Sequence, residues 1–214
     1  MLGTVALMHH EPGLRERKKA ATRSALCEAA IELSLQEGFD AVTAEQIAAR
    51  AGVSTRTFHN YFSSKEAAVM YQKRTAIFSF ADFVRQHRPD EPILNVLRDG
   101  IIEQINHQDI SADQLRAREQ MIRESPALTT YGVSELTEIS LTVINEIAEF
   151  TGTDPEKDLY PKILCAAVIA AVHAAFDQWY HNPEGMKFTD VIAEAFAHIE
   201  VSEQPVKGNP RSPQ

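Results

Sequence analysis

The sequence predicts an all-α protein of about nine helices, in which a small N-terminal three-helix domain precedes a larger helical one. Apolar residues recur at helical spacing along most of the 214 residues. Alternating runs of Val, Ile or Thr, which are typical of strands, are missing from the sequence. The Pro and Gly residues that interrupt the helical pattern fall between its segments: Pro89, Pro92, Gly152, Pro155, Pro183 and Gly185.

The first helix is expected from about residue 14 to residue 37. Its apolar positions are Leu26, Ala29, Ala30 and Leu33. Gly38 follows as a stop signal, because glycine adopts the left-handed conformation that ends many helices. Phe39 and Val42 continue the apolar surface, so the following loop is expected to pack back on the same core.

Two short helices joined by a tight turn are expected between residues 43 and 65. Thr43 and Gln46 have the spacing of a capping box, which starts the first of them, and Gly52 ends it. Ser54 can cap the second helix, whose Phe58 points inward. The outward side chains of this second helix are hydrogen-bonding types: Thr55, Arg56, Thr57, His59 and Asn60. Helix-turn-helix proteins place such residues in the DNA major groove.

The remaining helices are predicted from periodicity and from Pro and Gly positions. A long helix follows Lys65 to about His87, and Ser63 with Glu66 has the spacing of a second capping box. Further helical segments are expected near residues 92–107, 111–124, 126–151, 155–181 and 188–201. The leader, residues 1–12, and the Pro-rich tail, residues 202–214, are expected to be disordered.

Charge is divided unevenly along the chain, whose net charge is −9. Residues 1–65 hold 8 basic and 7 acidic residues, whereas residues 66–214 hold 13 basic and 23 acidic ones. Between Gly13 and Ser24, Glu16 is outnumbered by five basic residues: Arg15, Arg17, Lys18, Lys19 and Arg23. A basic segment directly before a helix-turn-helix indicates phosphate contacts, with a solvated helix start as the plainer alternative.

Other classes of protein find little support in the sequence. Cys27 and Cys165 lie far apart in amphipathic segments, which favours buried, reduced thiols in a cytoplasmic protein. No run approaches the roughly 18 apolar residues of a membrane span. A glycine-rich phosphate loop, a nucleophile elbow and paired metal-binding cysteines are all missing, so no catalytic residue, cofactor or metal is expected. His173 and Asp177, one helical turn apart, are the weak exception.

The N-terminal motif resembles the tetracycline-repressor (TetR) family of bacterial regulators over about residues 14–66. The resemblance is carried by Thr43, by the run Gln46-Ile47-Ala48, by Gly52-Val53-Ser54, by the run from Phe58 to Phe62 and by Lys65. It implies a DNA-binding domain at residues 13–65 and an effector-binding and dimerisation domain at residues 66–201. It further implies a ligand-responsive transcriptional regulator, usually a repressor, that binds a pseudo-palindromic operator as a dimer. The alternatives are an all-helical interaction protein without effector binding, and an enzyme.

The resemblance also implies roles for individual residues on the DNA side. Thr43, Tyr61 and Lys65 are expected to hold phosphates. Four residues are expected to face base edges or flanking phosphates: Thr55, Arg56, Thr57 and His59. Arg56 is the preferred base reader, because a guanidinium can pair bidentately with guanine. The roles of Asn60 and Glu45 stay open.

In the larger domain, the resemblance places the dimer interface on the last two helices, about residues 155–201. This segment alternates Ala pairs with larger apolar residues on more than one face, although an entirely internal helix would show a similar pattern. A small hydrophobic or aromatic effector is expected between about Val69 and Phe176. The candidate contacts, each of which could instead belong to the core or the surface, are Phe78, Phe83, His107, Arg116, Met121, Tyr131, His173 and Trp179.

Overall fold

The computed structural model describes residues 13–87, 90–108, 110–182 and 186–199, and its regular structure there is entirely helical. The helices are α1 (Leu14–Glu37), the short 3-10 helix η1 (Phe39–Ala41), α2 (Ala44–Arg50), α3 (Thr55–Tyr61), α4 (Lys65–Gln86), α5 (Ile93–Asn106), α6 (Ala112–Glu124), α7 (Pro126–Thr151), α8 (Tyr160–His181) and α9 (Phe188–Ala197). The predicted all-α class is confirmed. The expected disordered leader and tail lie outside the described residues.

The chain divides into two compact units, Met1–Tyr71 and Gln72–Gln214. Helix α4 begins in the first unit and ends in the second, so it is the covalent connection between them.

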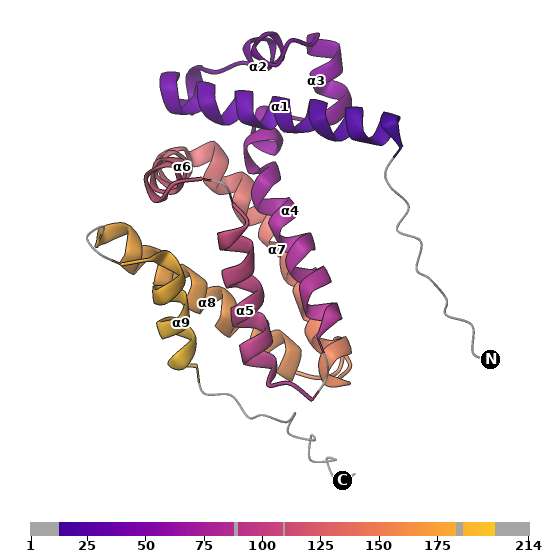
Figure 1. Ribbon diagram of the computed structural model, residues 1–214, viewed down its shortest axis with the longest axis vertical. Coiled ribbons are helices and arrows are strands. Elements are labelled where there is room, and N and C mark those ends of the chain that lie inside the picture. The colour runs from indigo at the N-terminus through magenta and orange to yellow at the C-terminus, as the bar shows by residue number, and fades with distance from the viewer. Residues whose placement is uncertain (1–12, 88–89, 109, 183–185, 200–214) are drawn as a thin grey trace, which may run out of the picture. The chain divides into compact units, whose positions relative to one another are not determined.

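The first unit is a three-helix core closed by the start of α4. In Figure 1, α2 and α3 lie on the same side of α1. The core side chains are Leu26, Cys27, Ala30, Phe39, Val42, Ile47, Phe58, Phe62 and Ala68, all buried. Gly38 (φ 85°) and Gly52 (φ 69°) end α1 and α2 in the left-handed region, where a side chain would strain the backbone.

Helix starts in this unit follow their caps. The hydroxyl of Thr43 accepts from the amide of Gln46, and the Gln46 side chain accepts from the amide of Thr43, so the predicted capping box forms. Ser54 caps α3 as expected. The expectation of a box between Ser63 and Glu66 is wrong. The hydroxyl of Ser64, the residue after Ser63, accepts from the amide of Ala67 at 3.2 Å instead. Helix α4 begins at Lys65, one residue later than a cap at Ser63 would place it.

The second unit packs α5, α7, α8, α9 and the C-terminal half of α4 around one core. Its most buried large side chains are Leu97, Leu128, Ile147, Leu164, Trp179 and Ile192. The indole N–H of Trp179 donates to the carbonyl of Met186 at 3.1 Å, which ties the end of α8 to the segment before α9.

Helices α8 and α9 are shorter than expected. Asp154 Oδ1 accepts from the amides of Glu156 and Lys157, so this segment forms a turn in place of a helical start, and α8 begins at Tyr160. Helix α9 ends at Ala197 in place of residue 201.

Helix α8 is apolar on two faces. By length and composition alone it could cross a membrane, a test that the core helix of a globular protein also passes. One face is buried through residues such as Leu164, Val168 and Trp179, as in the core helix of a globular unit. The opposite face exposes Ile163, Ala166, Ala170 and Ala174, and Leu159, which directly precedes the helix, is also exposed. We call these five residues the α8 stripe.

Candidate nucleic-acid interface and effector region

Helix α3 presents a polar face to solvent because a single aromatic residue anchors its other face. Phe58 is fully buried, whereas Arg56, His59 and Asn60 are exposed. Arg56 forms no ion pair or hydrogen bond through its side chain with the described residues, so its guanidinium is available to a partner outside the chain. A short exposed helix with such a face matches the geometry that enters the major groove.

The other predicted residues of α3 are partly engaged. Thr55 and Thr57 are half-buried, and the Thr57 hydroxyl lies 2.8 Å from the Ser54 hydroxyl at the cap. Thr57 therefore supports the start of α3. Thr43 is exposed at the start of α2, where its own hydroxyl serves as the cap, and Glu45 is exposed in the first turn of that helix.

Tyr61, the last residue of α3, belongs to a small aromatic and basic cluster. The guanidinium carbon of Arg23 on α1 lies 5.6 Å from the ring centroid of Tyr61 and 5.3 Å from that of Tyr71 on α4. Arg23 Nη1 also donates to the Tyr71 hydroxyl at 3.3 Å. The sequence did not point to this cluster, because 38 and 48 residues separate Arg23 from the two tyrosines.

Lys65 is engaged inside the first unit. Its ammonium donates to the carbonyls of Phe39 (2.9 Å), Asp40 (3.3 Å) and Val42 (2.9 Å). An ammonium has three N–H donors, so these bonds use all of them. In this structure the ammonium of Lys65 is therefore bonded internally, whereas the resemblance implies that it holds a phosphate.

The basic segment of α1 is divided in the same way. Arg15, Arg17, Lys18 and Lys19 are exposed on the first two turns of α1, whereas Arg23 is half-buried among the tyrosines. Four of the five basic side chains thus remain available to an anionic partner. They lie at the N-terminal end of α1, the helix that precedes the helix-turn-helix.

Comparison with known proteins agrees with this arrangement. The model for bacterial regulatory proteins of the tetR family matches residues 26–69, and the model for the MftR C-terminal domain matches residues 91–203. This chain belongs to the TetR family. It is a DNA-binding transcriptional regulator with a helical ligand-binding domain.

The TetR-family assignment is supported over most of the chain by similar proteins. The transcriptional regulator TcmR of Streptomyces glaucescens is 27% identical over 79% of this chain and 77% of its own length. The putative mycofactocin biosynthesis regulator MftR of Mycobacterium tuberculosis is 21% identical over 84% of this chain and 90% of its own. The solved structure of SmeT, repressor of a Stenotrophomonas maltophilia efflux pump, covers 91% of this chain and 99% of its own with a TM-score of 0.55 at 17% identity. That likeness concerns the fold.

The residues predicted to contact the effector lie in different environments of this TetR-family protein. His107 and His173 are exposed, so neither lines an interior site in this structure. Met121 is buried, and Phe83 packs against the core and stacks near His87 with ring centroids 4.2 Å apart. These four residues are thus surface or packing positions here.

Arg116 and Trp179 meet each other. The guanidinium carbon of Arg116 on α6 lies 4.1 Å from the Trp179 ring centroid, and farther along the two helices Arg123 lies 5.4 Å from Phe176 and 5.3 Å from Tyr180. Such cation–π contacts hold α6 against the aromatic face of α8.

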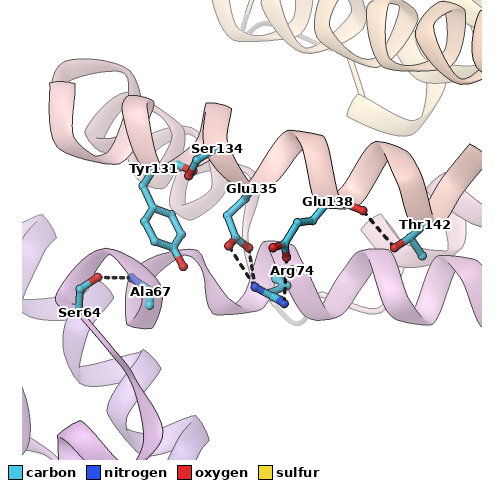
Figure 2. A network of polar contacts seen from close by, with 8 residues as sticks. All are labelled: Ser64, Ala67, Arg74, Tyr131, Ser134, Glu135, Glu138 and Thr142. Carbon is cyan, nitrogen blue, oxygen red and sulfur yellow. Dashed lines mark hydrogen bonds and ion pairs between the residues drawn. The ribbon is translucent and has the colours of Figure 1, made fainter.

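Phe78 and Tyr131 belong to the region between α4 and α7. A cavity of about 50 Å³ lies there, lined by Arg74, Ile77, Phe78, Glu135, Glu138, Ile139 and Thr142. Figure 2 shows the carboxylates of Glu135 and Glu138 turned toward Arg74, whose Nη1 bonds both oxygens of Glu135 at 3.0 Å. Burial, together with the nearby Glu135 carboxylate, raises the pKa of Tyr131. The cavity is smaller than the roughly 300 Å³ of a small-molecule pocket, so an effector here must displace side chains.

The two thiols do not have the lowered pKa of reactive cysteines, and the described residues that could bind a metal are not grouped to do so. Burial raises the pKa of Cys27 to about 12 and that of Cys165 to about 11, so both thiols stay protonated near neutral pH. Among the described residues no group of three or more His, Cys, Asp or Glu side chains is placed to hold a metal ion. His181 and Asp177 pair with each other at 3.8 Å on the surface of α8.

Proposed function

We propose that this protein is a cytoplasmic transcriptional repressor that binds a pseudo-palindromic operator as a homodimer and releases it when a small hydrophobic or aromatic effector binds. The observation that carries the proposal is the exposed polar face of α3, held out by the buried Phe58. The exposed arginine in the first turn of α3 has no packing role within the first unit.

On the DNA side, we assign sequence readout to Arg56, with His59 and Thr55 beside it, and phosphate contacts to Thr43, Tyr61 and the exposed basic turn of α1. Thr57 supports the cap of the recognition helix, and because it is only half-buried we also keep it as a candidate contact to a flanking phosphate. Lys65 is left out of this set because its donors are bonded within the protein.

The homodimer is proposed to form through α8 and α9. The α8 stripe is an apolar face without a packing partner among the described residues of the chain, and its three alanines allow a second helix to approach closely. A twofold dimer presents two copies of α3, which is what two half-sites related by a twofold axis require.

Effector binding is proposed to act on the middle of α4. Between Met70 and Phe80 this helix has no buried residue, and it is held to α6 and α7 by polar contacts: Gln72 with Arg118, Lys73 with Glu119, and Arg74 with Glu135 and Glu138. An effector that inserts beside Phe78 would compete with these contacts. In this proposal α4 has one position that is competent for operator binding and one that is not. The effector can change DNA affinity only as far as its own affinity differs between these two positions.

A binding assay in two stages tests the proposal. Purified protein should retard DNA fragments from its own promoter region, with an affinity that falls steeply as salt rises. Compounds that raise its melting temperature in a thermal-shift screen should then release that DNA. A protein that retards no fragment at low salt, or whose stabilising ligands leave DNA binding unchanged, would contradict the repressor or the effector part respectively.

A further inference from the structure

The first two turns of α4 are fastened to the helix-turn-helix by two basic side chains, Lys65 and Arg23. Both had been expected to contact DNA. Both instead direct their polar atoms into the first unit, at opposite ends of the DNA-facing helices.

Lys65 holds the segment that leads into α2. It donates to three carbonyls within residues 39–42, and its nitrogen lies 4.4 Å from the centroid of the buried Phe39 ring. Thr43, the cap of α2 and a proposed phosphate contact, follows directly. The bonds to the Phe39 and Val42 carbonyls are partly buried, where main-chain acceptors need a partner, so we expect the position of Thr43 to depend on the ammonium group.

Arg23 holds the other end. Its guanidinium lies between the rings of Tyr61, which ends α3, and Tyr71, which lies two turns into α4. The Phe62 and Tyr71 rings also meet edge to face at 5.5 Å. The C-terminal end of the recognition helix is therefore joined to α1 and to α4 through one side chain.

We propose that Lys65 and Arg23 are positioning residues, which set the ends of α2 and α3 for a half-site and make the first two turns of α4 move with them as one body. This inference rests on the proposed DNA binding and names no contact with DNA for either residue. It separates two kinds of basic residue that look alike in sequence: two internal ones and the four exposed ones of α1.

The test compares Lys65→Met, which keeps the aliphatic stem and removes the donors, with the matched Lys18→Met in the exposed turn. Affinities for a selected operator and for random DNA are measured from low to high salt, at a temperature well below both melting temperatures. Lys65→Met should weaken operator binding about tenfold, leave random DNA binding nearly unchanged, and leave the salt slope unchanged. Lys18→Met should weaken both alike and make the slope shallower by about one unit.

Loss of global folding alone would lower both affinities in proportion, so the ratio of operator to random DNA affinity reports positioning. If Lys65→Met does not fold, Arg23→Met serves in its place with the same expected ratio and slope. A slope shallower by about one unit with an unchanged ratio would show phosphate contact and overturn the proposal. If the unmodified protein binds no DNA, the proposed function fails. That failure is distinguishable from failure of the internal bonds, because a lower melting temperature for Lys65→Met than for Lys18→Met would still reveal those bonds.

Discussion

Arg56 is the residue to which we assign most of the sequence-specific reading of DNA. It is exposed on α3, one position before Thr57 and two before the buried anchor Phe58, so the packing of Phe58 fixes the direction in which the guanidinium points. A guanidinium so placed can donate two parallel hydrogen bonds to guanine.

Replacing Arg56 with alanine should therefore reduce the discrimination between operator and random DNA and change little else. Arg56→Ala is expected to weaken operator binding by roughly 1–3 kcal/mol while random DNA binding changes much less. Fluorescence anisotropy with both DNAs measures the two affinities, and Lys19→Ala in the exposed turn of α1 provides the control that weakens both. Equal losses on both DNAs would assign Arg56 to phosphate.

At the scale of single elements, the start of α4 depends on one of two adjacent serines. Ser64 bonds the amide of Ala67, whereas Ser63 is exposed before the cap position. Ser64→Ala should lower the free energy of unfolding by about 1 kcal/mol, as is typical for loss of a cap, and Ser63→Ala should leave it within a few tenths. Urea denaturation of both variants measures the difference, and the reverse order would restore the box expected from sequence.

The contact between α4 and α5 requires a glycine. A Cβ at Gly100 would lie 2.8 Å from Cδ1 of Phe83 and 3.1 Å from Cδ2 of Phe80, closer than carbon atoms pack. Alanine has the better helix propensity, yet the steric cost should dominate, and Gly100→Ala is expected to destabilise the fold by about 1–3 kcal/mol. Gly13→Ala, where nothing lies within 4 Å of the new carbon, is the control. A Gly100→Ala variant that melts at a higher temperature would show that both rings move aside freely.

The elements differ in how far the sequence could predict them, for a physical reason. The capping box of Thr43 and the stops at Gly38 and Gly52 were predicted correctly, because caps and positive φ angles act over a few residues. The choice between Ser63 and Ser64 was wrong, because both have an amide at the right spacing.

The candidate site was less predictable than the helices. The internal roles of Lys65 and Arg23 depend on partners that are 23 to 48 residues away, and no local spacing records such contacts. Phe78 lines the cavity between α4 and α7, whereas His107 and His173 are exposed. The sequence could not separate these cases, because a side chain on an amphipathic helix does not show whether it faces solvent or a cavity between helices. Periodicity distinguishes faces of a helix but not the neighbours of each face.

At the scale of the whole molecule, two copies of the chain must associate before two half-sites can be read. The α8 stripe is the apolar surface proposed for this association, so a charge at its centre should prevent it. Ala170→Glu is expected to give a folded monomer by light scattering at micromolar concentration, because an unpaired carboxylate is costly to bury. It should also lose operator affinity at least as strongly as Arg56→Ala.

A matched control for that variant carries the same new charge elsewhere. Asn95→Glu places it on the exposed side of α5, outside the α8 stripe as defined, and should leave both the dimer and operator binding intact. An Ala170→Glu protein that remains dimeric would move the interface to another surface.

Selection of bound DNA from a random pool tests the central claim, that this chain reads DNA through two copies of α3, most directly. The expected result is an enriched pseudo-palindrome whose half-sites lie about one helical turn or a multiple of it apart, with Arg56→Ala relaxing the same position in each half-site. Enrichment of no sequence, or of a single unrepeated motif that Arg56→Ala leaves unchanged, would contradict it.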